Sequence, residues 1–357
     1  MTLSRRSLLL FITIAVAVIG VASAEDGKRP MTPLDLAQIQ SMEAAVISPD
    51  GSTIAAVRSI PRVLFEEADG KNWEVLYLID HPGEGARPFV TGEVNVSAVA
   101  WRPGASAVSF LAKRGDDEHQ RLYVIPTDGG EATPVLALGS EAQSYDWSPD
   151  GTRVAVVASE ALSKEDEALA EHGFDQEIFE EDFQPARVFI ADLKNGGEAR
   201  ALELDGSAVQ VKWSPTGDRL AVAVAPTPLV DDRYMFQKVH VVDLDSGEIV
   251  ASVEREGKLG NIEWSPDGSR LAMISAADLN DPSASSLLIA AASGGRPENL
   301  TPRFEGSVTA FAWRDEETLV VLADVGVGTE LYRVAASGGR LKAMGRFEDP
   351  AVYTALS

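Results

Sequence analysis

Four histidines in this sequence could act as bases or metal ligands: His81, His119, His172 and His240. In that order they lie in a Pro/Gly turn, beside a turn, in an acidic segment and within a strand-like run. None has a second ligand at the spacing of a metal motif. The sequence also lacks a Gly-x-Ser-x-Gly nucleophile motif, a His-Glu-x-x-His motif and a phosphate-binding glycine loop. We therefore predict no catalytic residue and no metal ligand in this chain, and we assign no binding residue.

Two acidic groups could bind an amine or a cation. Glu180 and Glu181 form a carboxylate pair within an acid-rich segment, residues 159–185, and could hold the free amino terminus of a substrate. We favour the alternative, a solvated acidic turn or helix. Residues 243–248 (Asp-Leu-Asp-Ser-Gly-Glu) faintly resemble a calcium loop. Because they occupy the place of a hairpin turn in other repeats, we expect a hairpin there and predict no cofactor.

The strands that would position these residues are predicted by a sequence motif, called here the phrase, that recurs six times. Each copy has an apolar or Trp residue, a tight turn rich in Pro, Asp and Gly, and then a short apolar strand. The copies begin at Ile47, Trp101, Trp147, Trp213, Trp264 and Trp313. Their successive spacings of 54, 46, 66, 51 and 49 residues match the length of a four-stranded propeller blade.

The chemistry of one repeat explains the expected strands. In the turn, Pro presets φ, Asp can bond its own backbone and Gly accepts a positive φ, so each turn reverses the chain. Apolar runs begin seven residues after the first position of the phrase, as at residues 54–57 and 154–157, and suit strands buried on both faces. A second turn phrase, as in residues 122–130, adds a second hairpin. We predict four strands per repeat, with the repeated Trp residues packing blade on blade rather than binding a ligand.

Composition limits the partners of the chain. The sequence has 357 residues, of which 45% are hydrophobic, so it can bury a large core. It has no cysteine and therefore no disulfide or thiol nucleophile. Its formal net charge of −24 would repel phosphate backbones and anionic membranes. We predict no nucleic-acid partner, and we attribute the acidity to solubility or salt tolerance.

The first 24 residues are typical of a secretory signal peptide. Arg5 and Arg6 precede an apolar stretch, residues 8–19, and Ala22-Ser23-Ala24 offers a cleavage site. The segment also resembles a twin-arginine signal, and an uncleaved anchor is the alternative to cleavage. We expect an exported protein, periplasmic or extracellular, with no membrane contact beyond this segment.

A linker and a short helix are predicted over residues 25–45. Thr32 has the form of a helix cap, with Pro33 in the first turn and Asp35 reaching back to the cap. Leu36, Ile39 and Met42 would form one apolar stripe of this helix. The propeller is predicted to occupy residues 46–357.

Three stretches carry a resemblance to a known family. They are residues 29–36 followed by 47–55, residues 110–114 with 120–124 and 128–132, and an acidic insertion ending in residues 179–182 and leading into 187–193. On these stretches the chain resembles the N-terminal β-propeller of the prolyl oligopeptidase family of serine peptidases, in its acylaminoacyl-peptidase-like branch. In that family, the resemblance implies, the propeller caps a C-terminal α/β-hydrolase domain that carries the Ser, Asp and His.

The repeats predict an all-β fold: a β-propeller of about six to seven four-stranded blades, the last incomplete, with a short N-terminal helix. Leu356 would stand at the Trp position of a seventh repeat, so we expect a fragment that lacks the hydrolase domain. The expected function is noncatalytic: the propeller of an exported serine peptidase would admit only peptides or unfolded segments, and its partner would be a peptide substrate held through the missing domain. The family's acidic pocket for an amino terminus cannot be carried over to Glu180 and Glu181.

Two other functions remain open at this stage. A stand-alone periplasmic propeller of the Tol type would act as a protein-binding scaffold. A propeller enzyme such as a metal-dependent lactonase would need Asp, Glu, Asn and His side chains that converge on the central channel, and the spacing of the sequence gives no sign of them.

Overall fold

The computed structural model describes residues 29–346, except 81–84, 175, 177, 179–182 and 281. The chain divides into two compact units, residues 1–39 and 40–357. The described part of the first unit contains one short helix, α1 (Pro33–Leu36). Thr32 caps this helix and forms a capping box with Asp35, as the sequence predicts. The signal segment predicted over residues 1–24 lies outside the described residues.

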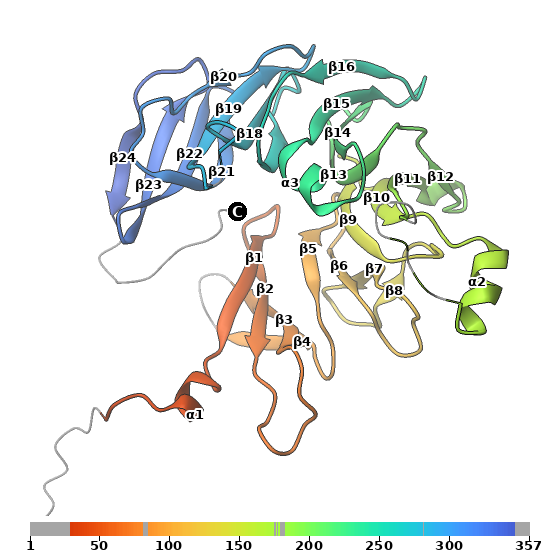
Figure 1. Cartoon of the computed structure of the whole chain (residues 1–357). Coiled ribbons are helices and arrows are strands. Elements are labelled where there is room, and N and C mark those ends of the chain that lie inside the picture. Colours follow the sequence, from red (N-terminus) through yellow and green to blue (C-terminus); the bar gives the residue numbers. More distant parts are fainter. Residues whose placement is uncertain are drawn as a thin grey trace, which may run out of the picture. The chain divides into compact units, whose positions relative to one another are not determined.

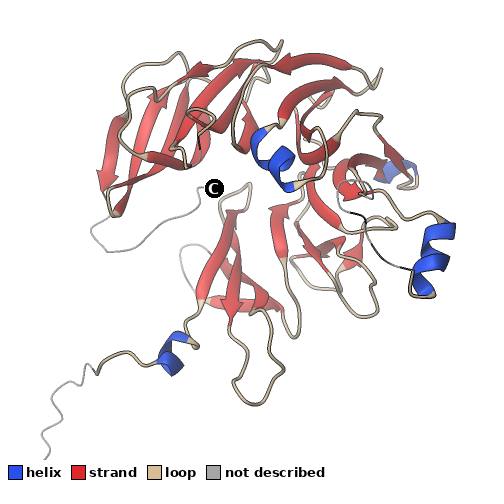
Figure 2. Ribbon diagram, in the orientation of Figure 1, coloured by secondary structure: helices blue, strands red, loops and turns tan. Residues whose placement is uncertain are grey.

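The second unit is a six-bladed β-propeller, and each blade is a four-stranded antiparallel sheet built from consecutive strands (Figures 1 and 2). In the first three blades the strands are β1 (Ser41–Ile47), β2 (Thr53–Ile60), β3 (Trp73–Asp80), β4 (Ala86–Val90); β5 (Ser97–Trp101), β6 (Ala107–Ala112), β7 (Arg121–Pro126), β8 (Thr133–Pro134); and β9 (Ala142–Trp147), β10 (Arg153–Ser159), β11 (Ala186–Asp192), β12 (Ala199–Ala201).

Blades 4 to 6 repeat this plan. Their strands are β13 (Ser207–Trp213), β14 (Arg219–Ala225), β15 (Lys238–Asp243), β16 (Ile249–Val253); β17 (Leu259–Trp264), β18 (Arg270–Ala276), β19 (Ser285–Ala291), β20 (Glu298–Asn299); and β21 (Ser307–Asp315), β22 (Thr318–Val325), β23 (Gly328–Ala335), β24 (Lys342–Arg346). The connections add α2 (Lys164–Glu171), a 3-10 turn η1 (Leu193–Asn195) and α3 (Val230–Met235). The prediction of two hairpins per repeat is confirmed.

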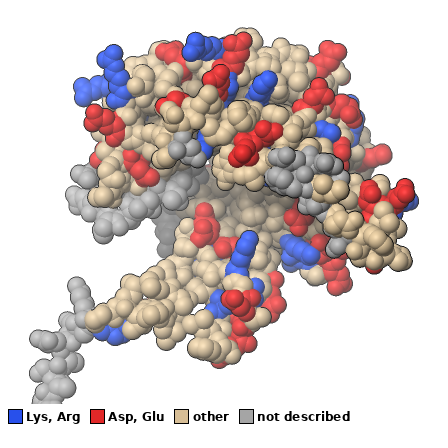
Figure 3. All heavy atoms as spheres, viewed as in Figure 1, with Lys and Arg blue, Asp and Glu red and all other residues tan. Residues whose placement is uncertain are grey.

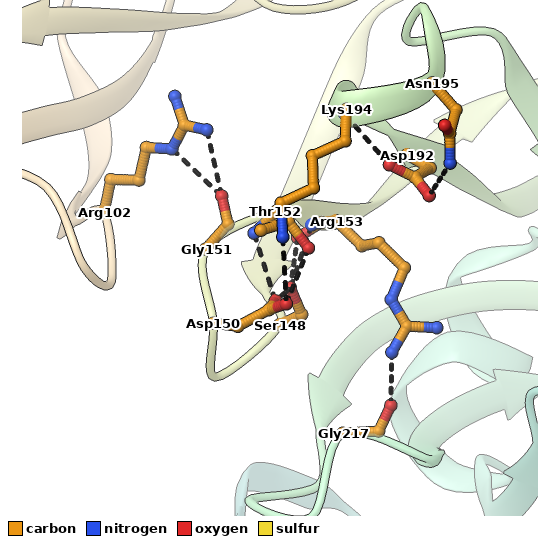
Figure 4. A network of polar contacts seen from close by, with 10 residues as sticks. All are labelled: Arg102, Ser148, Asp150, Gly151, Thr152, Arg153, Asp192, Lys194, Asn195 and Gly217. Atoms are coloured by element: carbon orange, nitrogen blue, oxygen red, sulfur yellow. Dashed lines mark hydrogen bonds and ion pairs between the residues drawn. The ribbon is translucent and has the colours of Figure 1, made fainter.

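The recurring turn joins the first two strands of a blade, and blade 3 shows how it is held (Figure 4). Ser148 Oγ donates to Asp150 Oδ1 at 2.7 Å, and the same oxygen accepts from the Thr152 N–H at 3.1 Å. Gly151 has φ +64° and donates its N–H to Ser148 O at 2.8 Å. These bonds close the hairpin inside a few residues, so each copy of the phrase folds the same way.

Five buried apolar clusters fill the five interfaces between successive blades. The cluster between blades 2 and 3 contains Trp147 beside Leu111 and Leu122, and the cluster between blades 4 and 5 contains Trp264 beside Val241. Trp101, Trp213 and Trp313 take the same place in three further clusters. The five Trp residues that begin repeats therefore pack blade on blade, as predicted.

Arginine side chains add a second, polar link between blades. Arg153 donates from Nη2 to Gly217 O of the next blade at 2.6 Å (Figure 4). Its Cζ lies 5.0 Å from the centre of the Trp213 ring. Arg219 and Arg270 repeat the ring contact on the Trp residues of blades 5 and 6. Each link combines a hydrogen bond to a turn carbonyl with a cation–π contact.

Two expectations differ from the described structure or fall outside it. The predicted apolar stripe of the N-terminal helix is wrong, because α1 ends at Leu36 and Met42 lies in β1, where it pairs with Arg58. Strand pairing along residues 41–47 takes precedence over a longer helix. The predicted start of a seventh repeat at Leu356 lies outside the described residues. Within the described chain, no helix has the length and apolar character needed to span a membrane.

Candidate functional site

The described histidines lie apart from one another. His172 ends α2 at the surface, and its Nδ1 contacts Ala168 O at 2.8 Å. His119 lies in the connection that precedes β7, and His81 is outside the described residues. In the described part of the chain, no three His, Asp or Glu side chains are grouped so that they could hold a metal ion.

His240 makes a contact that the sequence did not predict. It lies opposite Ser252 across strands β15 and β16, with Nδ1 2.7 Å from Ser252 Oγ. Burial and the nearby Lys238 lower the pKa of His240. Among the described residues no carboxylate accepts a hydrogen bond from its ring. The pair therefore lacks the third group that orients the base in a serine triad.

The acidic turn after β15 is a hairpin, as we expected. Asp243 Oδ1 accepts from the Ser246 N–H and from its hydroxyl, both at 2.9 Å. The Ser246 backbone bond lowers the pKa of Asp243. Both bonds hold the carboxylate inside the turn, as in other hairpins of this kind.

The acidic insertion contains the exposed helix α2, capped by Ser163. Its first turn carries three carboxylates, which suits the positive end of a helix dipole. The described part of the insertion therefore contains a solvated acidic helix. Glu180 and Glu181 lie outside the described residues.

Three charged residues that sequence reasoning missed lie on the first strands of blades 3, 4 and 5. Lys212 Nζ is 2.6 Å from Glu263 Oε1, and Asp146 Oδ2 accepts from the Trp213 N–H at 2.6 Å. Burial raises the pKa of Asp146 to about 6. Each of the three stands directly before the Trp of its repeat, and this regular position in the sequence could have identified them as candidates. They link neighbouring blades as a ladder of alternating charge.

A pocket of about 580 Å³ lies beside α3, between blades 4 and 5, and it is the candidate functional site. Its lining comes from α3, the start of β17 and the end of β18, and includes Val230, Arg233, Tyr234, Gln237, Lys258 and Leu259. In Figure 1, α3 lies next to β13 and β14. The only charged side chains among the described lining residues are Arg233 and Lys258. Acidic side chains are otherwise spread widely over the face shown in Figure 3.

Arg255 lines the neighbouring pocket, and it bonds two residues that line the pocket beside α3. Its Nη1 donates to Gln237 O at 3.0 Å, and its Nε donates to Ser275 Oγ at 3.2 Å. Its other partners are the carbonyls of Glu256 and Gly257. All these acceptors are neutral, and burial lowers the pKa of Arg255 to about 10. The positive charge is therefore held beside the pocket without a carboxylate among the described residues.

A second pocket, of about 990 Å³, shares Ser275 and Ala276 with the first. It also includes Arg255 and Arg296, but its lining mixes these cations with Glu254, Glu256 and Asp278. The balance of charge there gives no preference for an anion or a cation. Of the two pockets, the pocket beside α3 is the one whose described lining favours one sign of ligand charge.

Similarity to known proteins agrees with a propeller fold. A family model of the lipoprotein LpqB β-propeller domain matches residues 231–356. An uncharacterized peptidase of Bacillus subtilis, YuxL, is 28% identical over 132 residues, which cover 37% of this chain and 19% of that protein. The chain therefore spans about a fifth of the length of this curated relative.

Solved structures also agree with a propeller fold. Acylaminoacyl peptidase of Pyrococcus horikoshii has a TM-score of 0.60 and 12% identity, over 87% of this chain and 47% of that one. TolB of Acinetobacter baumannii has a TM-score of 0.51 and 16% identity, over 81% of this chain and 62% of that one. The chain is similar to propellers found both in peptidases and in TolB, and at these identities the likeness concerns the fold.

Proposed function

We propose that this chain is the noncatalytic propeller of an exported serine peptidase, in which it limits access to the reaction centre to peptides and unfolded segments. The observation that carries the proposal is the sequence match to a peptidase. The structural similarity of the propeller to nearly half of an acylaminoacyl peptidase chain supports it. The proposal assigns the chemistry to an α/β-hydrolase domain distinct from the described propeller.

The described residues support a binding role over a catalytic one. Ser252 and His240 form a hydrogen-bonded pair, but no carboxylate orients the histidine and neither residue lines the pocket beside α3. That pocket, in contrast, combines apolar walls with a few polar groups, as sites for small ligands and chain ends do. Restricting entry requires shape and binding, and it needs no nucleophile.

Two measurements test this proposal. A fluorophosphonate probe for active serines should leave the purified chain unlabelled, and labelling that disappears in Ser252→Ala would contradict a noncatalytic role. In fluorescence polarisation, an unstructured peptide should bind at least about tenfold more tightly than the same sequence held in a folded host protein, because a narrow site excludes folded surfaces. Equal affinity for the two forms would exclude gating.

A scaffold is the second candidate function, and the similarity to TolB and to the LpqB propeller model favours it. A scaffold should bind the folded host at least as tightly as the free peptide. Both candidates place the protein outside the cytoplasm, in line with the signal segment predicted at its amino terminus. Fractionation of cells that express the full sequence tests this location, and recovery in the cytoplasmic fraction alone would contradict it.

A further inference from the structure

In a strongly acidic protein, the described charged residues that line the pocket beside α3 are cationic. The sequence carries a formal charge of −24, yet the charged residues among the described lining of this pocket are Arg233 and Lys258. A concave site lined by one sign of charge concentrates ligands of the opposite sign. The pocket is therefore suited to an anionic group.

Arg255 strengthens this conclusion by comparison with two other arginines that bond to the connections between blades. Arg121 donates to Leu136 O and pairs with Asp117 at 3.1 Å, and Arg187 donates to Leu204 O and pairs with Glu160 at 2.8 Å. Arg255 makes the same kind of carbonyl bonds, but in the described structure no carboxylate accompanies it. A half-buried guanidinium whose described hydrogen-bond acceptors are all neutral gains stability from an added anion.

Gln237 adds a second and independent feature that a ligand of this pocket should match, an N–H donor. Its side chain lines the pocket, the residue is 6% exposed, and Oε1 has no hydrogen-bond partner. The Nε2 group of the same amide donates to Arg233 O, which fixes Oε1 as the open acceptor. An unpaired buried acceptor is costly, and an N–H donor on a ligand would satisfy it.

The walls add a third requirement, for an apolar group. Val230, Leu259 and Ile274 line the pocket, and Tyr234 stands at its edge, with its ring centre 5.8 Å from Lys258 Nζ. A ligand that matches all three features carries a negative charge, an N–H donor close to it and an apolar side chain. The C-terminal residue of a peptide has this combination, whereas phosphate has neither the N–H nor the apolar group.

We infer that the pocket beside α3 binds the carboxyl-terminal residue of a peptide that ends in an apolar side chain. The terminal carboxylate faces Arg233 near the charge of Arg255, the last amide N–H donates to Gln237 Oε1, and the side chain lies against Val230 and Leu259. This inference rests on the proposed function and adds to it: the propeller selects chains by their free carboxyl end. An N-acyl amino acid has the same chemistry, and the test separates the two sources.

The first experiment compares two forms of one fluorescein-labelled hexapeptide ending in Leu, with a free carboxylate or a C-terminal amide. The acid should bind at least about tenfold more tightly than the amide, because it alone forms charge-assisted bonds. Arg233→Gln should remove this preference, so that the acid binds about as weakly as the amide. Arg303→Gln, an exposed arginine in a different pocket, is the matched control and should retain the preference.

The second experiment addresses Gln237. A depsipeptide in which an ester replaces the last amide lacks the N–H, and it should bind about fivefold or more weakly than the amide-linked acid. In Gln237→Met this difference should disappear, while circular dichroism confirms that the variant is folded. A persistent difference would overturn the role of Gln237.

The outcomes distinguish this inference from the proposed function. If the acid and the amide bind equally, carboxylate recognition is excluded, but peptide binding and gating stand. If neither form binds, both proposals fail. Competition by N-acetyl-leucine alone, without any binding of the hexapeptide, would show a site for small acyl amino acids and would overturn the assignment to peptide ends.

Discussion

The turns of blade 1 and blade 3 have the same sequence, Ser-Pro-Asp-Gly, at residues 48–51 and 148–151. Their internal bonds are the same as well: the serine Oγ donates to the aspartate at 2.6 Å in one and 2.7 Å in the other, and the glycine N–H bonds the serine carbonyl at 2.8 Å in both. The two copies differ only in what surrounds them.

In blade 3 the turn is enclosed by the preceding blade. Arg102 donates to Gly151 O from Nε at 3.1 Å and from Nη2 at 3.0 Å (Figure 4). Trp147 is 5% exposed. In blade 1 the corresponding Ile47 is 49% exposed and belongs to none of the buried clusters of the described chain. Local chemistry therefore forms the turn, and packing between blades decides how much the turn contributes to stability.

Replacing the first residue of the phrase by alanine should give the largest difference in stability between blade 3 and blade 1. Trp147→Ala is expected to lower the free energy of unfolding by about 3–5 kcal/mol, because it empties a buried site and removes the bond from Nε1 to Ser109 Oγ. Ile47→Ala should cost less than about 1 kcal/mol, since half of its surface is already in water. Equilibrium unfolding in urea measures both, and similar costs would refute the comparison.

The turn glycines give the next contrast. Both have positive φ, +72° for Gly51 and +64° for Gly151, so alanine costs about 1–2 kcal/mol at either position from backbone strain. A Cβ at Gly151 would also lie 2.0 Å from Pro103 O, whereas at Gly51 it meets nothing within 4 Å. Gly151→Ala should therefore cost about 1–3 kcal/mol more than Gly51→Ala. Thermal unfolding of the two variants side by side tests this, and equal shifts in Tm would count against it.

The arginine link should have an intermediate effect. Arg102→Met removes two hydrogen bonds to Gly151 O and a cation–π contact on Trp147, and should cost about 1–2 kcal/mol. The exposed Arg58, which lies over Tyr77 within blade 1, is the control, and Arg58→Met should change stability by about 0.5 kcal/mol or less. A double-mutant cycle between Arg102 and Trp147 should show coupling; additive effects would mean that no link exists.

The smallest effect concerns the residue before the first apolar position, which is Val46 in blade 1 and Asp146 in blade 3. Burial raises the pKa of Asp146 to about 6, whereas an unfolded aspartate titrates near about 3.9. Between these values the folded protein holds the extra proton, so this group lowers the free energy of unfolding as the pH rises from 4 to 6.

Asp146→Asn should remove that slope, which is about 1 kcal/mol per pH unit inside the window. Urea unfolding at pH 4, 5, 6 and 7 measures the slope in both proteins. The turn carboxylates act in the opposite direction, because bonds from Ser48 and Ser52 lower the pKa of Asp50 to about 2, and they are unchanged in the variant. A slope that stays the same in Asp146→Asn would show that this group does not titrate in the window.

Much of the fold could be predicted from the sequence because its signals are local. The repeat at Trp101, Trp147, Trp213 and Trp264 indicated blades, and the apolar runs after each turn are the buried second strands, such as β10 and β14. The helix at residue 33 was predicted from its cap, but its end was not, because pairing of β1 with β2 depends on residues further along the chain.

The candidate site could not be predicted in the same way. Gln237, Arg255 and Ser275 belong to three connections or strands that the chain brings together only when blades 4 and 5 pack. No motif joins them, and each residue alone resembles an ordinary polar surface residue. The charged ladder of Asp146, Lys212 and Glu263 had a periodic signal, but its pairing also required the blades to be adjacent.

The sequence by itself determined the unit of this protein, a four-stranded sheet closed by a turn whose hydrogen bonds join residues at most five positions apart. Only the tertiary structure decided which copies of that turn are enclosed and where a pocket with unpaired polar groups forms. The contacts responsible, such as Arg102 to Gly151 at a separation of 49 residues, join different blades. Their energies depend on burial, which a chain acquires only by packing.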